Sequence, residues 1–163
     1  MTSLNAFRKT HGEPAWDDMV TGHDFGFLDP GEIQTWVPEG GPASTRLRAL
    51  AGEGLKTFEA YLWAACVEAV GKTPRPGSSR WSQAQDRWRE ALLREALATE
   101  STAAQLAARV ERLYEQVGCP EDMLGMLRPS QAWSGTPATV DPTAVQRFLD
   151  RSRSGSRHFG AAS

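Results

Sequence analysis

The chain has 163 residues, of which 40% are hydrophobic and 23% are charged, and its net charge is −2. These values exclude a disordered chain. A pI of about 5.9 argues against a general nucleic-acid binder, which needs a basic face. The longest uncharged apolar stretch, 60–67, is far too short to cross a bilayer, and no signal-peptide architecture is visible. We therefore expect a cytoplasmic protein that binds neither nucleic acid nor membrane.

Helix-start signals and apolar periodicity predict helices along most of the chain. The stretch DPGE at 29–32 begins a short helix, with aspartate as the N-cap, proline at the first helical position and glutamate at the third. The prolines and glycines of 37–42 end it. A long helical region begins at Ser44, and Gly52 and Gly54 are candidates for a break between two helices.

The middle of the chain continues in the same way. Apolar residues within 55–69 recur at three- and four-residue spacing and define one buried face, and Gly71 fits a C-terminal stop. A turn-rich connector at 72–79 leads to a helix over about 80–98. A capping pattern at Thr102 and Gln105 then begins a helix with a clear apolar stripe. That stripe consists of Leu106, Val110, Leu113 and Val117.

The C-terminal part contains two further helix starts. Proline and two acids at 120–122 begin a short helix that continues to Met126. The segment 128–139 is expected to be a loop, and Pro142 begins a last helix that ends near Arg151. The segment 152–163 lacks periodicity, and we expect it to be disordered.

These elements predict an all-α fold. No stretch alternates apolar and polar residues for long, so we expect about 60% helix and little or no sheet, with 25–28 as the place for a short extended segment. The predicted architecture is a compact bundle of four to five main helices with short flanking helices, in a single domain over 1–151. The tryptophans Trp63 and Trp81 are predicted to be buried, and the core should also contain Leu55, Phe58, Leu62, Trp88, Leu106, Val110 and Leu113.

The two cysteines lie far apart, and no secretory signal accompanies them. Cys66 falls in an apolar helical run, and Cys119 directly precedes a proline. We therefore expect reduced thiols rather than a disulfide. Neither cysteine has a nucleophile signature around it.

Charge is distributed unevenly. Residues 1–70 contain five Lys or Arg against ten Asp or Glu, and seven acids and no base lie between Lys9 and Arg46. An acidic surface with aromatic side chains suits a basic protein partner, because the carboxylates steer the encounter while the aromatics anchor the complex. A solvated acidic face without a partner is the alternative. The predicted partner-binding residues are Trp16, Asp17, Asp18, His23, Asp24, Phe25, Trp36 and Glu39.

Catalysis is the competing interpretation of the same region. A small metal- or acid/base-dependent enzyme would be centred on His23 and Asp24 with Asp18. The spacing of these residues matches no established metal motif, and no glycine-rich phosphate loop is present. We therefore predict no catalytic residue, no metal and no cofactor. A structural component of a larger assembly is a third hypothesis, and the oligomeric state stays open.

Two segments resemble small bacterial proteins of the polymorphic-toxin immunity type. They are GFLDPGEIQTWV (Gly26–Val37) and YEQVGCPEDMLGML (Tyr114–Leu127), about a sixth of the chain. The shared features are an early leucine-x-proline-x-glutamate-isoleucine helix start and a late glycine-x-proline-glutamate-aspartate-methionine turn. The resemblance implies a cytoplasmic inhibitor that binds a toxin and catalyses no reaction. We thus predict a non-catalytic protein-binding module that binds a basic toxin domain.

Overall fold

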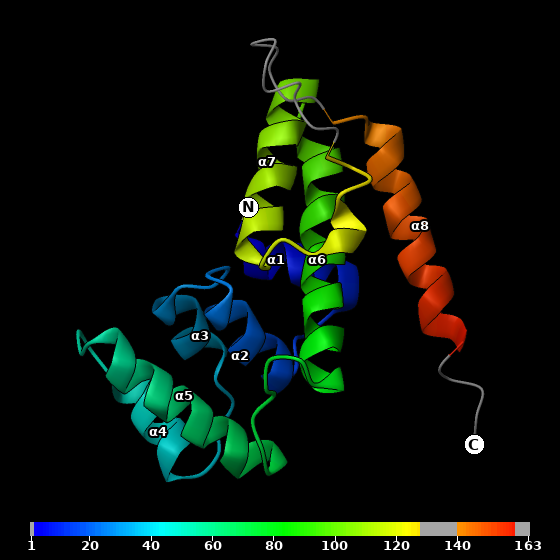
Figure 1. Cartoon of the computed structure of the whole chain (residues 1–163). Coiled ribbons are helices and arrows are strands. Elements are labelled where there is room, and N and C mark those ends of the chain that lie inside the picture. The colour runs from blue at the N-terminus through cyan, green and yellow to red at the C-terminus, as the bar shows by residue number, and fades with distance from the viewer. Residues whose placement is uncertain (1, 128–139, 159–163) are drawn as a thin grey trace. The chain divides into compact units, whose positions relative to one another are not determined.

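The computed structural model describes residues 2–127 and 140–158, with side chains up to Ser154. Within these ranges the protein contains eight α-helices, one 3-10 turn and no strand (Figure 1), so the predicted all-α class is confirmed. The helix count is higher than predicted, and the α-helices of nine residues or fewer all lie in the N-terminal half. The bounds are α1 Ser3–His11, α2 Trp16–Asp24, α3 Pro30–Trp36, α4 Pro42–Ala49, α5 Leu55–Val70, α6 Ser79–Thr99, α7 Ala103–Gln116, η1 Glu121–Met123 and α8 Pro142–His158.

The helices group into two compact units. The first comprises Met1–Trp88 and the second Arg89–Ser163, so the boundary falls inside α6. The single domain expected over 1–151 stays a prediction. No helix in the described part of the chain is both long and apolar enough to cross a membrane.

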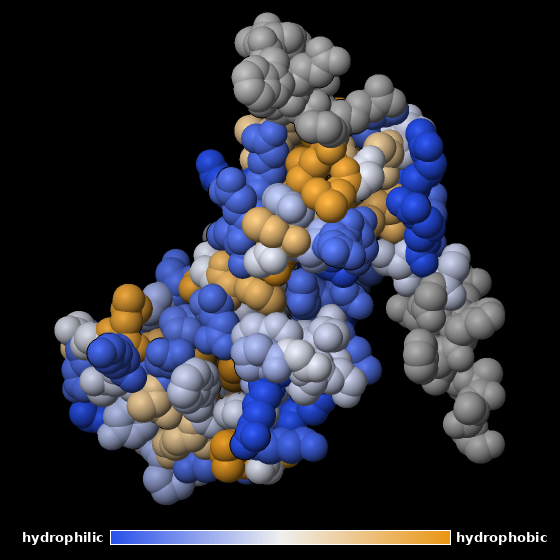
Figure 2. All heavy atoms as spheres, in the orientation of Figure 1, coloured by the Kyte–Doolittle hydropathy of each residue, from blue (hydrophilic) through white to orange (hydrophobic). Residues whose placement is uncertain are grey.

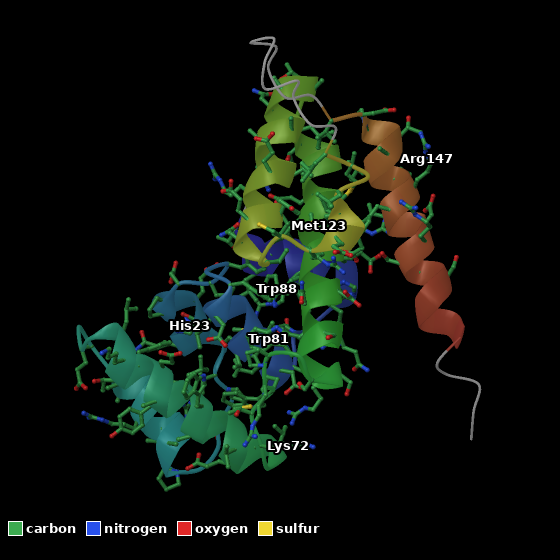
Figure 3. All side chains as sticks on the ribbon, viewed as in Figure 1. His23, Lys72, Trp81, Trp88, Met123 and Arg147 are labelled. Carbon is green, nitrogen blue, oxygen red and sulfur yellow. The ribbon has the colours of Figure 1, made fainter. Side chains whose placement is uncertain are left out.

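The core of the first unit is built around Trp88, which is completely buried. Its ring lies 4.6 Å from that of Phe7 and 5.5 Å from that of Phe27, measured between centroids. Its indole N–H donates to the carbonyl of Asp18 at 2.7 Å. A Cβ at Gly22 would lie 2.6 Å from the indole, so this glycine lets α2 approach Trp88 closely. Figure 3 shows Trp81 and Trp88 on α6.

Local signals set the helix ends of the first unit as predicted. The carboxylate of Asp29 accepts from the N–H of Glu32 at 2.9 Å, and the carboxylate of Glu32 accepts from the N–H of Asp29 at 3.2 Å. Together they form a capping box at the start of α3. Gly52 adopts a φ of +67° in the turn that separates α4 from α5. Gly71, in the left-handed conformation, ends α5.

The second unit packs around the apolar stripe of α7. All four residues of the predicted stripe are buried, and the hydroxyl of Thr102 accepts from the N–H of Gln105 at the start of the helix. Arg89 is only 7% exposed. Its guanidinium pairs with Asp122 at 2.7 Å and lies 5.4 Å from the ring centroid of Phe148. This arginine therefore connects α6 to both η1 and α8.

The prediction of burial is wrong for two residues. Leu55 is 67% exposed and Trp63 is 43% exposed, whereas the other predicted core residues and Trp81 are buried. The error lies in α5, where apolar residues occupy both sides of the helix. Because apolar periodicity alone fits either side, it did not indicate which side faces the core.

Two segment predictions need correction, and two others lie wholly or partly outside the described residues. Residues 25–28 form a turn after α2, in which the N–H of Phe27 donates to the carbonyl of Gly22, rather than an extended segment. Helix α8 continues to His158, beyond the expected end near Arg151. The predicted loop 128–139 and the last part of the predicted tail, 159–163, lie outside the described residues.

Candidate protein-binding face

The predicted aromatic anchors lie in or at the edge of the core. Trp16 is buried at the start of α2, and its ring meets that of Trp36 edge-on, with centroids 4.9 Å apart. Phe25 is half-buried, with its ring 5.2 Å from that of Trp81. Packing therefore accounts for these three side chains. Trp133, also an aromatic near a predicted loop, lies outside the described residues.

The carboxylates of Asp17 and Asp18 have arginine partners within the chain. Asp17 forms a two-bond ion pair with Arg80, in which its Oδ2 accepts from Nε at 2.7 Å. Asp18 is 3% exposed, and its Oδ1 accepts from Nε and Nη2 of Arg87 at 2.8 and 2.5 Å. Its Oδ2 accepts from the N–H of Ala15 at 2.9 Å. Although no base lies near these two acids in the sequence, arginines from α6 neutralise both of them in the fold.

The unneutralised acidic charge lies instead at the end of α2. Asp24 is exposed as a residue, but its carboxyl group is partly buried. This partial burial is the main cause that raises the pKa of Asp24 to about 6, and the negative charge of Glu59 is the second cause. Neither Asp24 nor Glu59 has an ion-pair partner among the described residues. These two side chains are called the acidic pair below. A basic group placed between them would relieve their mutual repulsion.

His23 lies beside the acidic pair but faces apolar surroundings. Its ring centroid is 5.6 Å from that of Phe58. Burial lowers the pKa of His23, while the charge of Glu59 acts in the opposite direction. The ring is thus disposed to be neutral. Glu39, the last of the predicted site residues, is exposed between α3 and α4.

The residues of the alternative enzyme hypothesis have different surroundings in the structure. No group of three or more His, Cys, Asp or Glu side chains able to hold a metal occurs among the described residues. Asp18, which the enzyme hypothesis places with His23 and Asp24, is bound to Arg87 and to the start of α2. Cys66 is buried, and burial raises the pKa of its thiol to about 11, which disfavours the nucleophilic thiolate.

The first unit has an exposed apolar surface on the outer side of α5 that the sequence pattern did not indicate. Trp63 is 43% exposed, and Val67 and Val70 are each 47% exposed. Ala60 is also exposed, one turn earlier. Figure 2 shows hydrophobic spheres, orange and tan, among polar ones over this helix. We call the four residues Ala60, Trp63, Val67 and Val70 the outer seam.

The outer seam runs opposite the buried side of the same helix. Its members are spaced by three, four and three residues, so they share one side of α5. The side that contains Phe58, Leu62 and Ala65 is buried and packs against α4 and α2. A helix that is apolar on both sides is normally buried on both, but the described residues cover only one side of α5.

The acidic pair borders the outer seam. Glu59 precedes Trp63 by four residues, which is about one helical turn, and Asp24 contributes its charge next to Glu59. At the other end, Lys72 follows the last turn of α5 (Figure 3). Lys72 is exposed and forms no ion pair among the described residues. The face therefore combines an apolar stripe with acid at one end and base at the other.

Comparison of the chain with protein-family models, with curated proteins and with solved structures finds no match. Function is therefore inferred from the geometry of this face and from the sequence.

Proposed function

We propose that this protein is a non-catalytic protein-binding module whose binding face is the outer seam of α5 together with the acidic pair. The single observation that supports this most strongly is the outer seam itself. Three large apolar side chains in a row on one helix, all more than two-fifths exposed, favour burial against another protein surface. Trp63 has the size and the position of an anchor at the middle of such an interface.

The acidic pair defines the electrostatic character of the partner. Asp24 and Glu59 repel each other, and neither has an ion-pair partner among the described residues. A partner that brings a lysine or arginine to this end of the seam gains charge-assisted contacts and fixes its orientation on the helix. The proposed partner therefore still carries a basic group, as expected from the sequence. The proposed binding face, however, consists of Asp24, Glu59 and the outer seam rather than Asp17 and Asp18.

A narrower form of the proposal is an immunity-type inhibitor that acts in the cytoplasm on a basic toxin domain. It is supported by the resemblance of Gly26–Val37 and Tyr114–Leu127 to proteins of that type. The two segments contain the start of α3 and the turn at η1. The narrower form thus rests on sequence resemblance, and the broader form rests on the surface of α5.

The proposal is tested by site-specific photo-crosslinking in the native cell. A photoreactive amino acid replaces Val67 in the outer seam, and in a control chain it replaces Arg112, an exposed residue of α7. We expect a discrete covalent adduct from position 67 that is missing from position 112, and mass spectrometry then identifies the bound protein. Indistinguishable adduct patterns at the two positions would contradict a binding role for the seam.

A further inference from the structure

The outer seam is complementary to itself when two copies of α5 run antiparallel. A two-fold axis that crosses the outer seam at the height of position 65 along the helix places each residue opposite the one equally far on the other side of that position. Trp63 then lies opposite Val67 of the other copy, and Ala60 lies opposite Val70. The seam thus maps onto itself without a gap, because its spacing of three, four and three is symmetric about position 65.

The side-chain sizes suit this arrangement. The two small alanines at the ends of the seam would each face a branched valine, and the two tryptophans would sit near the axis, where interface anchors are typically found. Lys56 also points along the seam, one turn before Ala60. In this register it would lie opposite position 74, beyond the end of the other helix at Val70, so its charge stays in water.

The charges distinguish the antiparallel arrangement from a parallel one. The acidic pair lies beside the first half of α5, and Lys72 follows its C-terminal end. An antiparallel pair brings Lys72 of each copy near Glu59 of the other, at both ends of the interface. A parallel pair would instead place the acidic pairs of the two copies next to each other, which is unfavourable.

We propose that the occupant of the outer seam is a second copy of this chain, with the two α5 helices packed antiparallel about a two-fold axis. This inference rests on the proposed function, in which the outer side of α5 binds protein. The second copy is chosen as the partner because the outer seam is complementary to itself in shape and in charge. The basic group that the acidic pair requires is then Lys72 of the second copy.

Sedimentation equilibrium of the purified full chain tests this directly. We expect the mean mass to rise from one chain to two with increasing concentration. Val67→Glu places a charge at the middle of the seam and should leave a monomer at every concentration, with unchanged helical circular dichroism. Leu124→Glu is the matched control, since Leu124 is an exposed apolar residue of the second unit, and should dimerise like the wild type. A wild-type monomer throughout would overturn the inference.

A charge exchange tests the antiparallel register. Glu59→Lys and Lys72→Glu should each weaken dimerisation about tenfold, because each creates a like-charge contact at both ends of the interface. The double variant restores opposite charges and should regain most of the lost affinity. If both single variants weaken the dimer and the double variant weakens it further, the antiparallel register is wrong.

These outcomes separate the inference from the proposed function. If the wild type stays monomeric while the photoreactive residue at position 67 captures a different protein, the second copy is excluded and the binding face stands. A crosslinked adduct of two identical chains supports both proposals. A monomer together with no specific adduct overturns both.

Discussion

Asp17 and Asp18 are neighbours in the sequence, but their carboxylates have different surroundings. The side chain of Asp17 and that of its partner Arg80 are both partly exposed, at 20% and 25%. Asp18 is almost completely buried, with hydrogen bonds to Arg87 and to the start of α2. A buried carboxylate depends on its partners because water cannot replace them, whereas an accessible ion pair contributes little to stability.

We therefore predict unequal costs for removing the two carboxylates. Asp18→Ala should lower the free energy of unfolding by about 3 kcal/mol, because it leaves the guanidinium of Arg87 unpaired and removes a cap of α2. Asp17→Ala should cost about 1 kcal/mol or less. Urea unfolding followed by tryptophan fluorescence measures both changes. Equal losses would mean that the burial of Asp18 has no energetic consequence.

The raised pKa of Asp24 should make the stability of the folded protein depend on pH. Its folded pKa of about 6 lies above the ordinary value of 3.8, so the folded state favours the protonated carboxyl. The stabilisation is fully present below the ordinary value and is lost as pH rises through 6. The lowered pKa of His23 acts in the opposite direction, since protonation of its ring on acidification disfavours the folded state.

Comparison with Asp24→Asn isolates the contribution of Asp24. The stability of the wild type relative to this variant should decrease as pH rises from 4 to 7, and His23 contributes equally to both chains. Urea unfolding at several pH values gives the difference. A difference that does not change with pH would show that Asp24 titrates normally in the folded state. Glu59→Gln should reduce the effect, because the charge of Glu59 is the second cause of the shift.

At the scale of one helix, α5 shows what sequence patterns can and cannot predict. Capping signals at Asp29 and Thr102 correctly predicted where α3 and α7 begin, because a cap depends on residues three positions apart. The partners of Asp17 and Asp18 could not be predicted in this way, since their arginines lie on α6, more than sixty residues later. The inward side of α5 is likewise decided by packing against α2 and α4 rather than by its own pattern.

The two sides of α5 should therefore respond differently to truncation. Leu62→Ala, on the buried side, should lower the free energy of unfolding by about 3 kcal/mol, through lost burial and a cavity. Val67→Ala, on the outer seam, should change it by less than about 0.5 kcal/mol when measured on the monomer. Chemical denaturation at low protein concentration gives both values. A large loss for Val67→Ala would place the seam inside the core.

At the scale of the whole chain, α6 belongs to both compact units. Its first part supplies Trp88 to the first unit, and its second part supplies Arg89 to the second. Adjacent residues of one helix thus pack into different cores. This boundary could not be predicted from the sequence, because α6 is continuous and contains no glycine or proline that would mark a division.

Hydrogen exchange can show how far the two units are coupled. Val110→Ala creates a cavity in the core of the second unit, because Val110 is fully buried on α7. We expect amide protection to fall most in α7 and α8, and to fall much less in α2. An equal loss of protection in α2 would show that the two units unfold as one cooperative domain.

Protein binding by the outer seam of α5 can be measured directly. The protein captured by the crosslink from position 67 is titrated by calorimetry against the wild type and against Val67→Glu. We expect the variant to bind at least about a hundredfold more weakly while it keeps wild-type helicity and stability. Equal affinities for the wild type and the variant would contradict protein binding by the seam.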